Sequence, residues 1–129
     1  MKKAAVPFLL LAMALHGVSA TSAGEAGFRR ISMQEAAAAM LEEENLIILD
    51  VRTQAEYDAG HIPGAICIPN ETIGSAVIPQ LPNKNQPIYV YCRSGNRSMQ
   101  AAGKLAKLGY SNVIEFGGIN AWTGEITTE

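Results

Sequence analysis

Hydrophobic residues along the chain fall into short runs that turn residues or charged residues separate. The runs at 46–49 (LIIL), 65–68 (AICI) and 88–91 (IYVY) are continuous and do not alternate with polar residues. Continuous runs of this length are typical of strands that are covered on both faces, as in a parallel sheet. We expect two further strands, a short edge strand at 28–31 and another strand at 112–116.

Two capping boxes predict where helices begin between these strands. Ser32 is followed three positions later by Glu35, and Thr53 is followed in the same way by Glu56. In this motif the hydroxyl and the carboxylate each satisfy a free backbone N–H at a helix start. The second of these helices is short, since Gly60 provides a stop signal.

A third helix is predicted over 96–108, where apolar side chains recur at helical spacing. Its expected buried stripe consists of Met99, Ala102, Leu105 and Ala106. The segment 71–81 has no clear period and is expected to be a short helix plus a loop. Strands that alternate with helices in a chain of 129 residues predict one α/β domain with a parallel sheet.

The first 23 residues have the layout of a secretory signal peptide. Lys2 and Lys3 precede a wholly apolar stretch at 4–15, and small residues follow up to Ala20 and Ala23 as candidate cleavage points. A membrane anchor is the alternative, but the apolar stretch is shorter than the roughly 18 residues that a span needs. We therefore expect a periplasmic or secreted protein without stable membrane insertion, and a domain over 24–129.

Loss of this leader changes the charge of the chain. Without Lys2 and Lys3, eight basic residues face twelve acidic residues, and the net charge is near −4. A mildly acidic domain has no general attraction for nucleic acid. A positive patch must therefore be local, and the candidate is the pair Arg93 and Arg97.

Cys92 comes directly after the apolar run 88–91 and precedes the helical pattern that begins at Asn96. The carboxyl ends of strands are where open α/β sheets bind ligands. Gly95 permits a tightly curved loop, and the N–H groups of a helix start favour an anion. The first anion stabilised there is the Cys92 thiolate, so we expect the pKa of this thiol to lie below about 8.5.

Three segments resemble the rhodanese-like sulfurtransferases. The loop 92–98 (CRSGNRS) is similar to the active-site loop of that family, and 50–65 (DVRTQAEYDAGHIPGA) and 117–122 (GGINAW) resemble its flanking motifs. The three occur in the family's order over roughly 28–125. The resemblance implies a three-layer α/β sandwich in which helices flank a central, mainly parallel sheet.

The resemblance also implies a reaction. Cys92 would attack the outer sulfur of thiosulfate or a similar anionic donor, release sulfite and hold the sulfur as a persulfide, which a thiol or cyanide would then accept. No metal and no cofactor is expected beyond this covalent intermediate, and the domain is expected to be a monomer. Arg93 beside the cysteine is similar to thiosulfate-preferring members. The implied site consists of Cys92 as catalytic residue, Arg93, Ser94, Gly95, Asn96 and Arg97 as substrate-binding residues, and Asp50 and Arg52 as supporting residues.

Several alternatives remain open from the sequence. Cysteine phosphatases and arsenate reductases place one residue more between cysteine and arginine than the four that separate Cys92 from Arg97, so the loop favours sulfur chemistry. A module that binds and delivers sulfur without turnover is the main rival. The two arginines could be solvated, and Ser94 and Ser98 could donate to an anion or only cap the helix.

Three other residues have mainly structural interpretations. Cys67 is expected to be a small buried hydrophobic residue, with a disulfide to Cys92 as the alternative in an exported chain. His61 lies in a turn motif, where its role in the family looks structural. Trp122 is expected to belong to the core.

Overall fold

The structure is a computed structural model that describes residues 27–129. The expected signal peptide, 1–23, lies outside the described residues, so the cleavage and export expectations stay predictions. No helix within 27–129 is long and apolar enough to cross a membrane.

Five strands form one sheet in the order β1-β5-β4-β2-β3, and every neighbouring pair is parallel. The strands are β1 (Arg29–Arg30), β2 (Ile47–Asp50), β3 (Ile66–Cys67), β4 (Ile88–Cys92) and β5 (Val113–Gly118). Each lies within a residue or two of the expected apolar run. The central strand β4 is buried at all five positions because helices cover both faces of the sheet, which explains its continuous apolar pattern.

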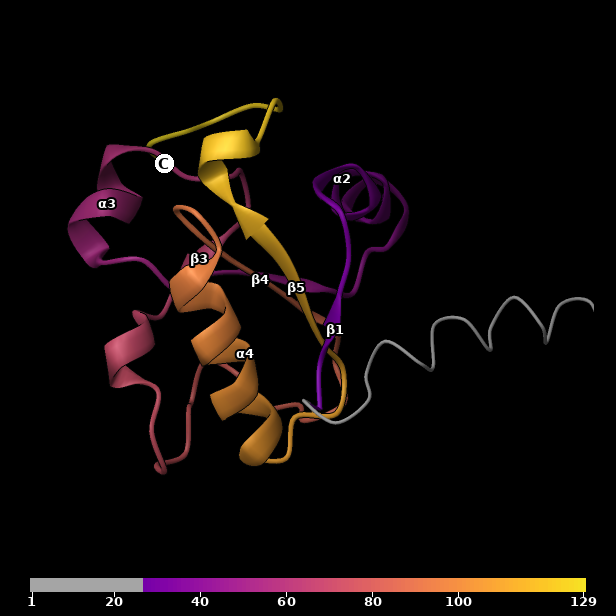
Figure 1. Cartoon of the computed structure of the whole chain (residues 1–129), viewed down its shortest axis with the longest axis vertical. Coiled ribbons are helices and arrows are strands. Elements are labelled where there is room, and N and C mark those ends of the chain that lie inside the picture. Colours follow the sequence, from indigo (N-terminus) through magenta and orange to yellow (C-terminus); the bar gives the residue numbers. More distant parts are fainter. Residues whose placement is uncertain (1–26) are drawn as a thin grey trace, which may run out of the picture.

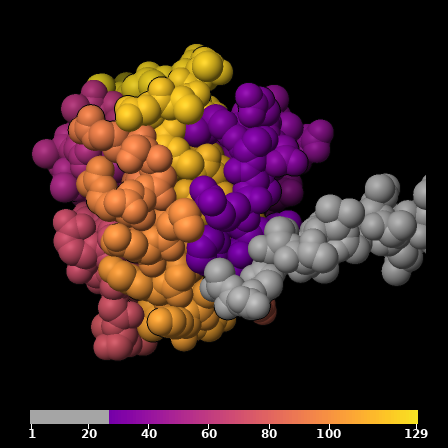
Figure 2. Space-filling view, viewed as in Figure 1, coloured from indigo at the N-terminus to yellow at the C-terminus, as the bar shows by residue number. Residues whose placement is uncertain are grey.

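Helices on both faces complete a three-layer α/β sandwich (Figure 1). They are α2 (Met33–Glu42), α3 (Gln54–Ala59) and α4 (Asn96–Lys107), with short 3₁₀ helices η1 (Asn70–Thr72) and η2 (Ile119–Ala121). In Figure 2, α4 in orange covers much of the visible face, and the yellow C-terminal segment lies between it and the indigo first elements. The fold class predicted from the sequence is confirmed.

The core has two parts, one on each face of the sheet. On the α4 face, Ala101 and Leu105 pack with Leu49, Val90 and Val113. On the α2 face, the buried residues come from α2, β4 and β5 and from the turn after α3: Ala36, Ile62, Ala65, Tyr89, Tyr91, Ile114 and Phe116. Each fully buried large apolar side chain contributes about 1.5–3 kcal/mol.

Both predicted capping boxes are present. Ser32 and Glu35 bond reciprocally at the start of α2, and Thr53 and Glu56 do so at the start of α3. Such a cap stabilises a helix by about 1 kcal/mol. These contacts connect residues three positions apart, which is why the sequence pattern was sufficient to find them.

The predicted buried stripe of α4 is confirmed at Ala102 and Leu105 but wrong at Met99 and Ala106, of which Ala106 is only partly buried. Met99 is 38 % exposed, and the fully buried side chains of the helix are Ser98, Ala101, Ala102 and Leu105. This set has equally good helical spacing, but a polar serine heads it. Within 71–81, the only helical turn in the described structure is the end of η1.

Candidate functional site

Cys92 is the last residue of β4 and lies at the carboxyl edge of the sheet. A register shift in the β4–β5 pairing brings Cys92 opposite Gly118. After three loop residues, α4 begins at Asn96, so the sulfur lies between a strand end and a helix start, as the sequence predicted.

Backbone N–H groups surround the sulfur. Gly95 donates its N–H to Cys92 Sγ at 3.0 Å, and its φ of 109° is a left-handed conformation that favours glycine. Burial by itself would raise the pKa of the Cys92 thiol. Hydrogen bonds from the Ser98 hydroxyl and from the N–H groups of Ser98, Gly95 and Ser94 outweigh burial, so the pKa lies below its ordinary value.

The tail motif supports this loop from the other side. The Asn120 N–H donates to the Arg93 carbonyl at 3.1 Å. A Cβ on Gly118 would clash with that same carbonyl oxygen, so only glycine permits the close approach. The loop 92–95 and the motif 117–122 therefore form one packed unit.

A single carboxylate holds both arginines of the loop. Glu56 Oε1 accepts from Arg97 at 2.8 Å, and Glu56 Oε2 accepts from Arg97 at 3.1 Å and from Arg93 at 2.9 Å. The Arg93 side chain is more than half exposed, whereas that of Arg97 is about one third exposed. Two cations and one anion leave a net charge of +1 beside the loop.

Glu56 was not predicted as a site residue, because its place in the capping box already explained it. The hydrogen bond from Arg97 is the largest cause that holds the pKa of Glu56 far below its ordinary value, and bonds from Thr53 and Arg93 add to it against the effect of burial. The carboxylate therefore remains ionised and fixes the positions of both guanidinium groups. No residue spacing along the chain signals this contact.

The other predicted loop residues are on the surface. Ser94 and Asn96 are exposed, and Asn96 is the first residue of α4. Gly95 is the N-cap residue and no side chain caps this helix, so the capping role considered for Ser94 and Ser98 is wrong.

Asp50 and Arg52, the two expected supporting residues, form a buried ion pair at the end of β2. Arg52 Nη2 lies 2.6 Å from Asp50 Oδ2, and the same nitrogen donates to the Gly60 carbonyl at 2.7 Å. Tyr91 donates its hydroxyl proton to Asp50 at 2.7 Å and accepts the N–H of Ile62 at 3.1 Å. The pair therefore fixes the segment after α3 against β4 and makes no hydrogen bond to the Cys92 sulfur.

Two polar residues below the sulfur complete its surroundings. Ser98 Oγ lies 3.4 Å from Cys92 Sγ and donates to Glu115 Oε2 at 2.6 Å. Ser98 was considered in the sequence only as an anion donor or a cap, and Glu115 was missed. Its signal is a single acidic residue in the otherwise apolar run of β5 (VIEFGG).

Cys67 and His61 do not join the site. Both cysteines are free thiols, so the disulfide considered from the sequence is wrong. Burial and the nearby Asp50 carboxylate raise the pKa of the Cys67 thiol to about 11. His61 stacks on Tyr57 with ring centroids 3.6 Å apart and pairs with Thr127 of the C-terminal segment, in keeping with a structural role.

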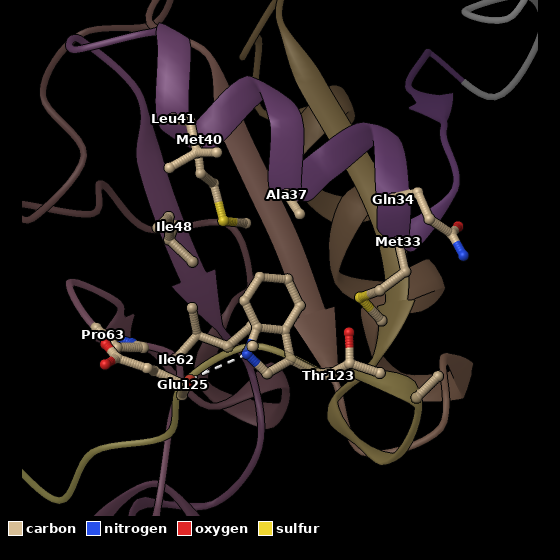
Figure 3. Close-up of a pocket in the computed structure, with 13 residues that line it drawn as sticks. Met33, Gln34, Ala37, Met40, Leu41, Ile48, Ile62, Pro63, Thr123 and Glu125 are labelled. Atoms are coloured by element: carbon tan, nitrogen blue, oxygen red, sulfur yellow. Dashed lines mark hydrogen bonds between the residues drawn. The ribbon is translucent and has the colours of Figure 1, made fainter.

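An apolar groove of about 460 Å³ lies on the opposite, α2 face of the sheet, between α2 and the segment 121–125 (Figure 3). Met33 and Met40 of α2 line one side and Ile62 lines another, but Cys92 does not line it. Trp122 also lines the groove and donates its Nε1–H to the Glu125 carbonyl at 3.0 Å. This indole is half-buried and packs against the core on the α2 face, so it lies at the boundary of the core to which it was expected to belong.

Known proteins are similar to this chain in sequence and in fold. The chain is 40 % identical over 84 residues to the "Putative sulfur carrier protein YrkF" of Bacillus subtilis. The aligned region covers 64 % of this chain and 44 % of that protein. It is 34 % identical over 96 residues to the "Thiosulfate sulfurtransferase GlpE" of Tolumonas auensis, and the aligned region covers 74 % of this chain and 88 % of that protein. The solved structure "rhodanese with anions from E. coli" matches with a TM-score of 0.59 and 31 % identity, and the match covers 64 % of this chain and 98 % of that structure's chain.

Coverage differs widely among these relatives, and this chain spans less than half the length of the Bacillus protein. The family model for the rhodanese-like domain matches residues 33–125, from the first residue of α2 to the segment after Trp122. The match includes Cys92, its loop and both flanking motifs. This chain therefore belongs to the rhodanese-like domain family.

Proposed function

We propose that this protein is a sulfurtransferase that carries a sulfane sulfur on Cys92. The thiolate attacks the outer sulfur of thiosulfate or a similar anionic donor, the S–S bond of the donor breaks, and sulfite leaves with the bonding electron pair. A thiol or cyanide then removes the outer sulfur of the persulfide and releases Cys92. Two relatives, one named as a thiosulfate sulfurtransferase and one as a putative sulfur carrier, support this class of reaction.

The observation that carries the proposal is the position of Cys92 Sγ. It receives the Gly95 N–H at 3.0 Å at the start of α4, and its pKa lies below the ordinary value. A lowered pKa makes a thiolate available as a nucleophile at neutral pH. Arg97 and Arg93, both held by Glu56, supply a net positive charge on the side from which an anionic donor would approach.

Burial of the sulfur adds a requirement to this proposal. Cys92 has no exposed surface, whereas Arg93 and Ser94 over the loop are exposed. A donor therefore reaches Sγ only when these loop residues move aside. Loops that present a reactive group commonly open on binding.

The test is the intact mass of the purified protein before and after incubation with thiosulfate. We expect a gain of one sulfur atom in the wild type and no gain in Cys92→Ser. The matched control is Cys67→Ser, which should gain the sulfur as the wild type does. A gain that persists in Cys92→Ser would place the sulfur elsewhere and reject the proposal.

A carrier without turnover is a second candidate, and the name of the Bacillus relative favours it. Such a module would form the persulfide but transfer its sulfur to a partner protein and only slowly to small acceptors. Stopped-flow transfer from the persulfide to cyanide, to glutathione and to a protein thiol distinguishes the two. Rapid transfer to the protein thiol alone would favour the carrier.

We also propose that the protein is exported, on the basis of the apolar stretch 4–15 and the small residues that come after it. The same intact mass, measured on protein from a native host, tests the cleavage. A mass that matches residues 21–129 or 24–129 is expected, and the uncleaved mass would contradict export by this route.

A further inference from the structure

The apolar groove between α2 and the segment 121–125 has no role in the proposed reaction (Figure 3). Its volume is about 460 Å³, and Cys92 does not line it. Among the described residues that do line it, Glu125 is the only charged one. A hollow apolar surface with polar residues at its rim commonly marks an interaction site.

One wall of the groove is a stripe of apolar side chains on α2. Met33, Ala37, Met40 and Leu41 line it, and their spacing places them on one face of the helix. Ala36 is the only fully buried residue of α2, whereas α4 buries four side chains. Leu41 is 89 % exposed. The helix therefore presents an apolar face that the sheet does not bury.

The opposite wall contains the indole of Trp122, which is held in place. Its Nε1–H donates to the Glu125 carbonyl at 3.0 Å, and Gly124 leaves room for the ring, because a Cβ there would lie 2.7 Å from the indole. In Figure 3 the side chains of Met33 and Met40 point from α2 into the groove. Methionine adapts its shape to a partner, and both residue types are enriched at protein interfaces.

The charges beside the groove are negative. Glu42, Glu43 and Glu44 follow Leu41 at the C-terminal end of α2, and all three are exposed. The last turn of this helix contains no basic residue, so no cation offsets the negative end of its dipole there. Such a field attracts cationic side chains and repels anionic lipid and nucleic acid.

We propose that this groove docks a basic amphipathic helix of a partner protein. The apolar side chains of the partner helix enter between α2 and Trp122, and its Lys or Arg side chains lie against Glu125 and the acidic residues 42–44. From Met33 to Leu41, α2 rises about 12 Å, which about two turns of a partner helix match. A helix in an apolar groove is a recurring mode of recognition. Such docking is independent of the proposed sulfur transfer.

Fluorescence of Trp122 gives the first test, because this is the only tryptophan in the chain. The probe is a Leu/Lys peptide of about three helical turns, with its leucines on one face and no aromatic residue. The control peptide has glutamate in place of every lysine. We expect a saturable emission shift with the lysine peptide, at least about tenfold weaker binding of the control, and weaker binding as salt is raised. Equal binding of the two peptides, or no shift with either, would overturn the proposal.

Two variants with equally exposed positions show whether the peptide occupies the groove. Leu41→Lys removes an apolar contact and repels the lysine peptide, so binding should weaken about tenfold. The matched control is Val77→Lys, because Val77 is also 89 % exposed but does not line the groove. It should bind as the wild type does. The same loss in both variants would assign the effect to net charge and contradict docking in the groove.

The acidic end of α2 is tested separately. Glu42→Gln combined with Glu44→Gln should weaken binding of the lysine peptide several-fold, because two charges beside the groove are lost. Asp58→Asn combined with Glu71→Gln changes the net charge by the same amount at exposed positions that do not line the groove. This control pair should have little effect, and equal weakening by both pairs would contradict local charge complementarity.

A second copy of this chain and the apolar leader of the chain are the other possible occupants. Sedimentation at rising protein concentration detects self-association, and intact mass shows whether residues 1–23 are present. Self-association that Leu41→Lys abolishes would assign the groove to a second copy. Peptide binding that begins only after loss of the leader would assign it to the leader, and either result overturns the proposal. No readout uses a sulfur donor, so a failure here is distinct from a failure to form the persulfide.

Discussion

Cys92 and Cys67 end two strands at the same edge of the sheet, yet the pKa values of their thiols are shifted in opposite directions. Cys92 ends β4 and Cys67 ends β3, with β2 between them. The pKa of Cys92 lies below its ordinary value, whereas burial and Asp50 raise the pKa of Cys67 to about 11. In the sequence, both cysteines belong to or directly adjoin an apolar run.

The difference comes from the residues after each strand. After Cys92 the chain turns at Gly95 into a twelve-residue helix, whose first N–H groups face the sulfur. After Cys67 come Ile68 and then Pro69, which has no N–H to donate. The sulfur of Cys67 instead contacts the Arg52 carbonyl at 3.7 Å. A cysteine at the carboxyl edge of the sheet is thus not reactive by position alone, because its thiolate also needs hydrogen-bond donors that stabilise it.

Removing each sulfur in turn should give the largest contrast. We expect Cys92→Ser to abolish thiosulfate-dependent formation of thiocyanate, because no other described thiol has a lowered pKa, and Cys67→Ser to stay close to wild type. Circular dichroism should show that both variants fold. A large loss in Cys67→Ser would mean that Cys67 takes part in the cycle and would undo the comparison.

Alkylation of the wild type should separate the thiols without any mutation. At pH 7 a thiol whose pKa is about 11 has only about one part in ten thousand as thiolate, so Cys92 should react with iodoacetamide at least about a hundredfold faster than Cys67. Peptide mass mapping over a time course measures both rates. Similar rates at the two sites would show that the N–H groups around Cys92 do not activate it.

A strained loop should lower the reactivity of Cys92 more moderately. Gly95 and Gly64 both have positive φ, 109° and 87°, and a Cβ at Gly95 meets only ordinary contacts. Alanine at either position should cost roughly 1–2 kcal/mol of conformational strain. Gly95→Ala should also slow Cys92 alkylation about tenfold by displacing an N–H donor. Gly64→Ala is the matched control, and an equal slowing there would assign the effect to general destabilisation.

The smallest effect should come from the charge of Glu56, which fixes the arginines near Cys92. Because Arg97 lowers its pKa in the folded state, this carboxylate stabilises the fold above its ordinary pKa of about 4.3, and the contribution is lost as pH falls below that value. Glu56→Gln keeps a capping-box side chain but not the charge, so it should cost up to about 1 kcal/mol at pH 7. Urea unfolding at pH 7 and pH 3 measures the change. A cost that does not shrink at pH 3 would contradict this assignment.

The sequence by itself determined the local features of this protein. Continuous apolar runs marked β2, β3 and β4, and the capping boxes at Ser32 and Thr53 marked the starts of α2 and α3. The succession from strand to Cys92 to helix also predicted the surroundings of the sulfur. These features depend on residues within a few positions of each other, so the order of residue types is enough to specify them.

Only the tertiary structure decided which distant side chains meet around the loop. Arg97 and Glu56 are 41 positions apart, and Ser98 and Glu115 are 17 apart. Glu56 already had a local explanation, and Ser98 lay outside the apolar stripe that the pattern favoured. Their contacts exist because parallel pairing brings the ends of β2, β4 and β5 to one edge of the sheet, and no local spacing encodes that path.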